Sequence, residues 1–367
     1  MTLTAADTLR ITSKVYRLTA PYTVSETAVE RELGPGDVAV RPTLGSICHA
    51  DLRYFTGNRR PEALKKKLPM ALIHEGIGIV AASRSSAFRP GDRVVVVPNI
   101  PGYAFLGEDA VRARLEQGPS PDDNYSPDGR FLGSGFDGLA QSAVVVPALC
   151  AVRIPDEVPD EIAVLTELST VSHQAACRVR EQLKNASVAV FGDGPVGYLT
   201  AALLHHLFGV PRERLTVFGV IPEKLAQFDF AAAENVKSYD FAAGSGRFDV
   251  AVECAGGRFS ADAINQAIDV LKPGGQLILL GVSEELVPIN TRDILEKGIT
   301  VFGSSRSCFR DYPPVLEAMK DPAYQRTLRR LLPDEFTPVR SAEDFAFAMK
   351  RTGEHPHWKK VVLKFEW

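Results

Sequence analysis

The first half of the chain contains a thiol, an imidazole and carboxylates of the kinds that bind transition metals. Cys48 lies three residues before Asp51, His74 is followed directly by Glu75, and Glu167 stands far downstream. Thiolate, imidazole and carboxylate are ligands that zinc accepts, and a catalytic zinc leaves one position for solvent or substrate. Asp51 suits a supporting role, in which its carboxylate holds the imidazole of His74 in one tautomer.

Residue types alone leave two structural explanations open for this set. Cys48 also fits a small buried apolar residue, and His74 also fits a core histidine with its hydrogen bonds satisfied. The chemistry of the side chains does not decide between these roles and a metal site.

A glycine-rich loop follows an apolar strand in the second half of the chain. The loop has the spacing G-x-G-x-x-G, between the strand-like run SVAVF and the helical run VGYLTAALLHHLF. Glycines at these positions allow a tight turn, close approach of backbone to a pyrophosphate and close helix–strand packing. The helix N-terminus then faces the phosphates, although an ordinary glycine-rich turn is the alternative. The expected dinucleotide-binding residues are Gly192, Asp193, Gly194, Pro195, Val196 and Gly197.

The end of the next strand bears on which dinucleotide binds. An Asp or Glu at this position would bind the ribose 2′-hydroxyl, but the chain has Gly219, with Lys224 shortly after it. Loss of the carboxylate removes repulsion against a 2′-phosphate, and Lys224 could pair with that phosphate. The sequence therefore favours NADP over NAD, although the site has no arginine and Lys224 also fits a solvated lysine at a helix start.

Hydrophobic patterns predict an α/β protein with two kinds of domain. Residues 1–166 contain short β-rich runs separated by Pro-Gly-Asp turns, which indicates a strand-rich, barrel-like domain. Residues 167–306 contain six apolar strands at βαβ spacing, among them NVKSYDF, which indicates a doubly wound parallel sheet. Residues 307–367 end in the strand-like run HWKKVVLKFEW and are expected to return to the first domain. The polar segment 102–137 is expected to be a long surface loop or lobe.

Composition narrows the class of protein. The 42 basic and 45 acidic residues give a net charge of −3, which argues against a nucleic-acid partner. No apolar run approaches the roughly 18 residues of a membrane span, and the N-terminus lacks the apolar stretch of a signal peptide. Five cysteines without a C-x-x-C pair argue against a disulfide framework and favour a reducing cytoplasm.

These motifs together resemble the zinc-dependent medium-chain dehydrogenase/reductase superfamily over nearly the whole chain. The resemblance rests on Cys48 with Asp51, the run HEGIGIV from His74, the PGDRVV turn, TELSTVSH and the GDGPVG loop. The strings SICHADLRYFTG, KLPMALIHEGIG and LEKGITVFGSSRS are similar to those of bacterial ribulose-5-phosphate reductases in particular. The resemblance implies a GroES-like catalytic domain and a Rossmann domain, with zinc at Cys48, His74 and Glu167 and with Glu75 as a further or alternating ligand.

The resemblance also implies an activity, the NADPH-dependent, zinc-assisted reduction of D-ribulose 5-phosphate to D-ribitol 5-phosphate. This product is a precursor of CDP-ribitol and hence of teichoic acid or capsule, and the family suggests a homodimer with a cytidylyltransferase partner. The alternatives are an NAD-dependent polyol dehydrogenase of the sorbitol or xylitol type, a dehydrogenase of a related cyclitol or sugar phosphate, and a non-catalytic member of the fold.

Arginines are the expected contacts of a substrate phosphate because the guanidinium group binds it in a bidentate manner. Analogy with the fold directs Arg53 and Arg306 toward the cleft, and Tyr54 lies beside Arg53. A core or inter-domain ion pair is the alternative role for each arginine. The basic run from Arg59 to Lys67 is instead expected to be a solvated face.

Two departures from the alcohol dehydrogenases carry consequences. The segment 102–137 lacks the cysteines of a second, structural zinc, so we expect one zinc per chain. Ala50 stands where a serine or threonine starts the proton relay. The proton must therefore arrive by another route, and the candidates are zinc-bound water held by Glu75 or Glu167, and Tyr54.

The charge of such a zinc site depends on how many glutamates bind. Zn²⁺ with the Cys48 thiolate, neutral His74 and one carboxylate sums to zero, whereas a second carboxylate makes the site negative. A negative site is a poorer Lewis acid, so we expect one glutamate to leave when substrate or water binds.

Overall fold

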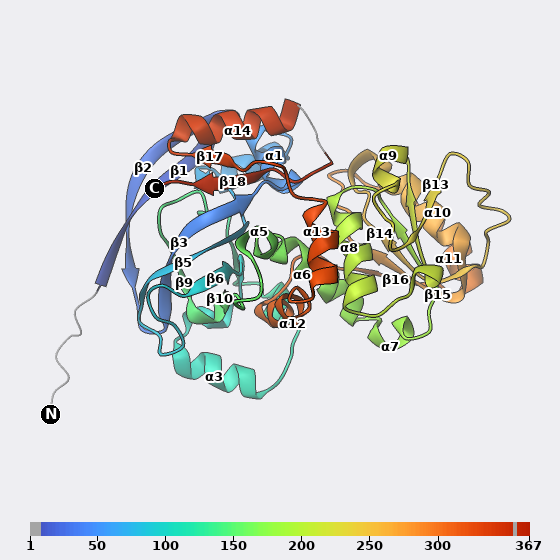
Figure 1. Cartoon of the computed structure of the whole chain (residues 1–367), viewed down its shortest axis with the longest axis horizontal. Helices are drawn as coiled ribbons and strands as arrows, with labels where there is room; N and C mark the ends of the chain where they lie inside the picture. The colour runs from blue at the N-terminus through green and yellow to red at the C-terminus, as the bar shows by residue number, and fades with distance from the viewer. Residues whose placement is uncertain (1–8, 355–357) are drawn as a thin grey trace. The chain divides into compact units, whose positions relative to one another are not determined.

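The chain forms two compact units in a computed structural model that describes residues 9–354 and 358–367 (Figure 1). Within these residues the first unit contains the chain up to Glu167 and the segments 308–317 and 332–367, and the second contains 168–307 and 318–331. The segment 318–331, which was expected to return to the first domain, therefore lies in the second unit. The first eight residues, part of the N-terminus expected to lack a signal peptide, lie outside the described residues.

The first unit is built mainly from antiparallel strands. A three-stranded sheet has the order β2–β1–β4, formed by β1 (Leu9–Ala20), β2 (Thr23–Leu33) and β4 (Met70–Ala71). A larger sheet has the order β10–β6–β5–β3–β18–β17, with β9 also paired to β3. Its strands are β3 (Asp37–Ser46), β5 (Glu75–Ser83), β6 (Arg93–Val96), β9 (Val144–Pro147), β10 (Ala151–Arg153), β17 (Thr337–Val339) and β18 (Val362–Phe365). The strand-rich first domain is confirmed.

The register of the larger sheet brings distant segments together at the end of β3. Ser46 pairs with Glu75 on one side and with Val362 on the other. The strands approach this closely because β5 carries glycine at two points. A Cβ on Gly76 would lie 2.6 Å from Leu139 Cδ1, and one on Gly78 would collide with the backbone of β3.

Short helices surround these sheets. They are α1 (His49–Phe55), α2 (Pro61–Lys67), η1 (Gly102–Phe105), α3 (Glu108–Glu116), α4 (Asp122–Tyr125), η2 (Ala148–Cys150), α5 (Asp160–Ala163), η5 (Phe309–Asp311), α12 (Tyr312–Ala318) and α14 (Ala342–Glu354). The segment 102–137 therefore contains helices as well as β8 (Arg130–Phe131), which pairs with β7 (Asn99–Ile100). Sequence patterns did not reveal α3 because none of its residues is buried, so it has no apolar stripe to detect.

The second unit contains a parallel sheet with strands in the order β13–β12–β11–β14–β15–β16. This order confirms the doubly wound class. The strands are β11 (Val188–Phe191), β12 (Leu215–Gly219), β13 (Ala232–Asn235), β14 (Phe248–Glu253), β15 (Leu271–Leu279) and β16 (Thr300–Gly303). The helices are α6 (Thr166–Cys177), α7 (Arg180–Leu183), α8 (Pro195–His206), η3 (Arg212–Arg214), α9 (Pro222–Leu225), η4 (Gly257–Phe259), α10 (Ser260–Val270), α11 (Thr291–Lys297) and α13 (Pro322–Arg329).

One strand of this sheet was predicted in the wrong place. The run NVKSYDF was expected to be a strand, but β13 ends at Asn235, where that run begins. Val236, Tyr239 and Phe241 instead pack against the core cluster as loop residues. Their apolar side chains suggested a strand, because apolar residues in a sequence indicate burial but do not distinguish a buried strand from a buried loop.

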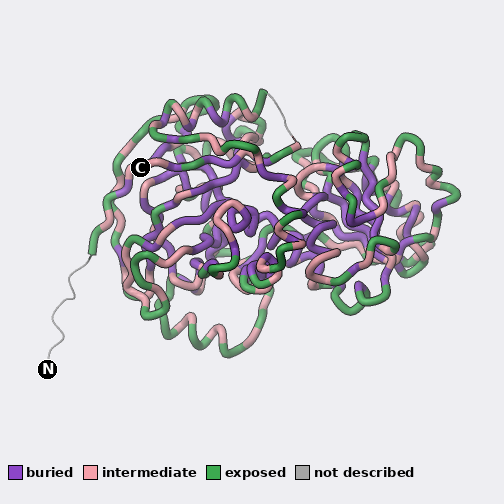
Figure 2. Tube along the Cα trace, viewed as in Figure 1, coloured by how far each residue is buried: buried purple, intermediate pink, exposed green. Residues whose placement is uncertain are grey.

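Buried residues concentrate along the strands of each unit, and the outer helix faces are exposed (Figure 2). Across the described part of the chain, no helix has the length and apolar character needed to cross a membrane.

Asp137 connects all three strands of the smaller sheet. Its carboxylate accepts hydrogen bonds from Arg17 at 2.6 and 3.0 Å, from Arg31 at 2.5 Å and from the Ala71 N–H at 2.9 Å. Burial would raise the pKa of Asp137, but the hydrogen bonds from Arg17 and Ala71 and the charges of both arginines outweigh it and lower that pKa. A lowered pKa means that the ionised carboxylate stabilises the folded state.

We expect Asp137→Asn to lower the free energy of unfolding by about 2 kcal/mol at neutral pH, because two guanidinium groups lose their anion. The folded-state pKa lies below the unfolded value of about 3.9, so this stabilisation is present above that pH and disappears as pH falls through the folded-state pKa. Urea unfolding at several pH values measures the effect. Asp109→Asn, at a 97% exposed side chain in α3, is the control. Equal losses in the two variants would contradict the role of Asp137.

Candidate metal and dinucleotide sites

Asp51 joins the two segments that carry the candidate metal ligands. Cys48 is the N-cap of α1, and its N–H donates to Asp51 Oδ2 at 3.0 Å. The other oxygen, Oδ1, accepts the Ile73 N–H at 3.0 Å and lies 3.5 Å from His74 Nδ1. Asp51 is 1% exposed, so these contacts are shielded from water. One buried carboxylate therefore sets the distance between the thiol and the imidazole.

The turn before His74 has an unusual backbone. Ile73 has φ 71°, a left-handed conformation that is rare for a β-branched residue. Its N–H donates to Asp51, and its carbonyl accepts the Leu139 N–H at 2.7 Å. A side chain on Gly138 would collide with that carbonyl. Hydrogen bonds at both the N–H and the carbonyl of Ile73 thus hold the backbone conformation that presents His74.

Cys48, His74 and Glu75 gather into one group. Each offers a ligand atom, and these atoms lie within 4.8 Å of one another. His74 and Glu75 are buried and Cys48 is partly exposed. In the described part of the chain, Glu75 Oε1 is a buried oxygen without a hydrogen-bond partner. A buried oxygen of this kind beside a thiol and an imidazole fits a metal ion, which would supply the missing contact.

Lys360 is a residue of this site that the sequence analysis missed. Its ammonium lies 2.7 Å from Glu75 Oε2 and donates to the Ile47 carbonyl at 3.0 Å, and the Ser46 hydroxyl donates to the same Glu75 oxygen at 2.6 Å. Lys360 is 6% exposed, whereas the neighbouring Lys359 is exposed. The only signal in the sequence was a lysine just before an apolar strand, and nothing in that pattern distinguishes the two lysines.

Glu167 lies within electrostatic reach of the group but is not part of it. Burial raises the pKa of Glu167 to about 7, with His74 opposing the rise and Glu75 adding to it. Burial would lower the pKa of His74, but Asp51 and Cys48 outweigh it and raise that pKa well above its usual value. The raised pKa of His74 indicates negative groups around it, as expected where a cation binds, whereas that of Glu167 mainly reflects burial.

The expected substrate residues are distributed between the two units. Tyr54 is buried on α1, beside the half-buried Arg53. Arg306 belongs to the second unit, where it is exposed and has φ 63° in the segment after β16.

The basic run after α1 is only partly a solvated face. Lys65 and Lys66 are exposed, as expected. Lys67 turns inward, however, and donates to the Tyr54 hydroxyl at 2.7 Å, and the Arg59 guanidinium lies 4.5 Å from the centroid of the Tyr54 ring. The expectation is thus wrong for these two residues, because a buried phenol between them provides a partner that the sequence does not show.

The glycine-rich loop of the second unit forms a tight turn between β11 and α8. Gly192 has φ 139°, a conformation that favours glycine, and a Cβ on Gly197 would collide with the Gly192 carbonyl. Gly194 is the N-cap of α8, and Pro195 is its first residue. A Cβ on Gly194 would meet no heavy atom within 4 Å, so the backbone is open on that side. This is the geometry that close approach of a phosphate requires.

The side chain of Asp193, which belongs to the glycine-rich loop, lies at the end of β12. The sequence analysis expected no carboxylate at this position. Its Oδ2 accepts the Val220 N–H at 2.8 Å and the Ile221 N–H at 2.9 Å, and a Cβ on Gly219 would lie 2.6 Å from Asp193 Cβ. Lys224 Nζ lies 4.0 Å from Asp193 Oδ1. The strand end thus has one negative and one positive group, rather than a lysine alone.

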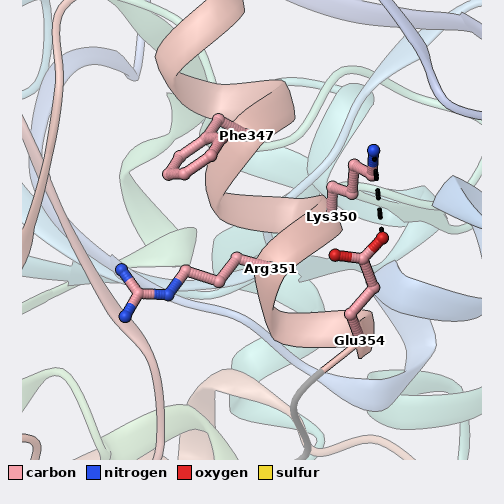
Figure 3. Close-up of a pocket in the computed structure, with 4 residues that line it drawn as sticks. All are labelled: Phe347, Lys350, Arg351 and Glu354. Carbon is pink, nitrogen blue, oxygen red and sulfur yellow. Dashed lines mark ion pairs between the residues drawn. The ribbon is translucent and has the colours of Figure 1, made fainter.

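A hollow on the first unit lies along α14 and is lined by Phe347, Lys350, Arg351 and Glu354 (Figure 3). All four residues lie on the exposed face of this helix, and Lys350 and Glu354 form an ion pair at 3.8 Å. The candidate metal ligands are not among them, so we assign this hollow no role.

Comparisons with known proteins identify the family of the chain. The alcohol dehydrogenase GroES-like domain family matches residues 34–156, and the zinc-binding dehydrogenase family matches residues 195–321. Ribulose-5-phosphate reductase 1 of Staphylococcus aureus is 38% identical over 96% of this chain and 99% of its own length. The ribulose-5-phosphate reductase of Bacillus spizizenii has the same identity and coverage.

A solved structure supports the same grouping. S. aureus TarJ in complex with NADPH superimposes with a TM-score of 0.80 at 34% identity, covering 97% of this chain and all of TarJ. Identity at this level over nearly the full length shows more than a common fold. The chain therefore belongs to the zinc-dependent medium-chain dehydrogenase/reductase family of oxidoreductases.

Proposed function

We propose that the protein catalyses the NADPH-dependent, zinc-assisted reduction of D-ribulose 5-phosphate to D-ribitol 5-phosphate. The observation that carries the proposal is the Cys48, His74 and Glu75 group in a chain 38% identical to a ribulose-5-phosphate reductase. The NADPH bound to TarJ supports NADP(H) as the cofactor.

Zinc would be held by Cys48, His74 and Glu167, with Glu75 as a further or alternating ligand. His74 Nδ1 faces Asp51, which leaves Nε2 as the nitrogen for the metal. When bound, zinc supplies a Lewis acid for the substrate carbonyl and NADPH supplies the hydride. The protein's part is to orient the imidazole and to keep His74 and Glu75 shielded from water.

Lys360 changes the charge count of this site. Zn²⁺ with the Cys48 thiolate and both glutamates sums to −1, and the ammonium of Lys360 brings the sum to zero. Both carboxylates can therefore stay ionised near the metal. Glu75 is the better candidate for the glutamate that exchanges, because Lys360 and Ser46 hold one of its oxygens whether or not the other contacts a cation.

The cellular setting follows from the same proposal. The product is a precursor for CDP-ribitol and hence for teichoic acid or capsule, in the cytoplasm. A homodimer and a cytidylyltransferase partner belong to this proposal as well.

A second candidate is an NAD-dependent polyol dehydrogenase of the sorbitol or xylitol type. The observation in its favour is the Asp193 carboxylate at the end of β12, which would repel a 2′-phosphate.

We expect the purified protein to contain one zinc per chain and to oxidise NADPH with D-ribulose 5-phosphate far faster than with ribulose or fructose, or with NADH as the reductant. Cys48→Ala should lose the metal and at least about 1,000-fold in kcat/KM, because a ligand and the carbonyl's Lewis acid are lost together. Metal analysis and initial rates measure both effects, and circular dichroism shows that the variant is folded. Turnover of the unphosphorylated sugars with NADH would instead establish the polyol dehydrogenase.

Lys224→Ala should raise the KM for NADPH by about 10-fold, the loss of one charge-assisted contact, and leave the KM for NADH within about 2-fold. Steady-state rates with each cofactor measure the difference. The exposed Lys237 of the same unit, changed to Ala, is the matched control. Equal increases for both cofactors would show that Lys224 does not contact a 2′-phosphate.

Lys360→Met should alter the visible absorption bands of the cobalt-substituted protein, because Glu75 loses the cation that holds it and its contact to the metal changes. We expect kcat/KM to fall about 10-fold or more, with Lys360→Arg restoring much of it. Lys359→Met at the exposed neighbour is the control. A cobalt spectrum identical to that of the unchanged protein would refute the positioning role.

A further inference from the structure

We propose that Arg59, Lys67, Ser134 and Tyr54 form an anion site that binds the phosphate of the substrate beside the metal group. The inference rests on the proposed function, because it concerns the phosphate of that same substrate. It assigns to Lys67, Arg59 and Ser134 a role that the sequence analysis gave to Arg53 and Arg306.

Three polar groups form a closed triangle at the centre of this site. Lys67 Nζ lies 2.7 Å from the Tyr54 hydroxyl and 2.8 Å from Ser134 Oγ, and the two hydroxyls are 2.9 Å apart. The Arg59 guanidinium covers the Tyr54 ring at 4.5 Å from its centroid. Tyr54 is 3% exposed, so the triangle has a buried side, and Lys67 and Ser134 are partly exposed at the other.

The ammonium of Lys67 has hydroxyl groups rather than an anion as its partners. Within the described residues no carboxylate lies within ion-pair distance of Lys67, whose hydrogen bonds go to two hydroxyl groups. Asp137, three residues after Ser134, is already bound by Arg17 and Arg31. A half-buried ammonium costs solvation free energy unless an anion joins it. A phosphate would supply that anion and accept hydrogen bonds from the same donors.

The Tyr54 hydroxyl reports the same positive potential. Burial would raise the pKa of Tyr54, but the hydrogen bonds from Lys67 and Ser134 and the charges of Lys67 and Arg59 outweigh it and lower that pKa. A neighbourhood that stabilises a phenolate also stabilises a phosphate oxygen.

Two of the segments that carry the cluster also border the metal group. Tyr54 lies on α1, which begins after Cys48 and also carries Asp51. Ser134 follows Phe131, whose ring centroid is 5.5 Å from that of His74, and a Cβ on Gly133 would lie 3.6 Å from His74 Cβ. A pentose phosphate carries a carbonyl and a phosphate in one small molecule. The metal group would bind the carbonyl end, and the neighbouring cation cluster would bind the phosphate end.

Helix α2 supplies a matched control. Its last turn presents Lys65 and Lys66 to solvent and Lys67 to the cluster. Replacing Lys66 or Lys67 by Met makes the same change in net charge and side-chain length, and only Lys67 contacts the hydroxyls.

Calorimetric titration of the zinc-loaded protein with D-ribitol 5-phosphate and with inorganic phosphate tests the site. We expect Lys67→Met to weaken binding of both ligands about 10- to 100-fold, and Arg59→Met about 10-fold, since each removes a charged contact. Lys66→Met should bind both ligands as the unchanged protein does. The ratio of the rate with ribulose 5-phosphate to the rate with ribulose should fall in Lys67→Met and Arg59→Met and stay unchanged in Lys66→Met. Arg59→Met keeps the test valid if Lys67→Met does not fold.

Unchanged phosphate affinity in both Lys67→Met and Arg59→Met would overturn the proposal. The proposal would also be overturned if turnover with ribulose and with ribulose 5-phosphate fell equally while phosphate affinity stayed unchanged. Tyr54 and Lys67 would then serve to deliver the proton of the reduction rather than to bind the phosphate. If the unchanged protein does not reduce ribulose 5-phosphate but binds phosphate in a Lys67-dependent manner, the reductase proposal fails and the anion site stands.

Discussion

The buried carboxylate of Asp51 is the interaction on which the first unit's site depends. It accepts the N–H of Cys48 at one oxygen and that of Ile73 at the other, and it faces the imidazole of His74. A single rigid group therefore joins the helix start that bears the thiol to the strained turn that bears the imidazole. Since water is excluded there, neither segment has an alternative partner, and the ligand atoms are held close before any cation arrives.

Charge balance explains how so many ionisable groups coexist in this small volume. Glu75 is held by Lys360 from the C-terminal strand region and by Ser46 from the end of β3. Burial disfavours an ionised carboxylate, and it raises the pKa of Glu167 to about 7. The ammonium of Lys360 supplies a counter-charge to Glu75 without occupying its second oxygen. That oxygen remains available, and its lack of a partner in the described protein is consistent with a metal ligand.

The two places where phosphate groups are expected differ in their balance of positive and negative side chains. Near Tyr54, Lys67 donates to two hydroxyl groups, Arg59 lies over the phenol ring, and no carboxylate among the described residues pairs with Lys67. At the end of β12, Asp193 and Lys224 place one charge of each sign, and the carboxylate also ties the glycine loop to the strand end. The first place is therefore the one that we propose for the substrate phosphate, whereas cofactor selectivity at the second depends on how far Lys224 offsets Asp193.

Local spacing within the sequence was enough to predict the fold class and the glycine loop, because turn glycines and strand runs act over a few neighbours. The residue types singled out Cys48, His74 and Glu167 but left structural roles open for the thiol and the imidazole. The resemblance to a known family implied the zinc ligand set, with Glu75 as a further ligand, and the activity. Lys360, Ser134 and the inward turn of Lys67 were not predictable, nor was the carboxylate of Asp193 beside Gly219. Each is an electrostatic contact between segments far apart in the chain, and only the strand register and helix packing of the tertiary structure decide which charged side chains are buried together.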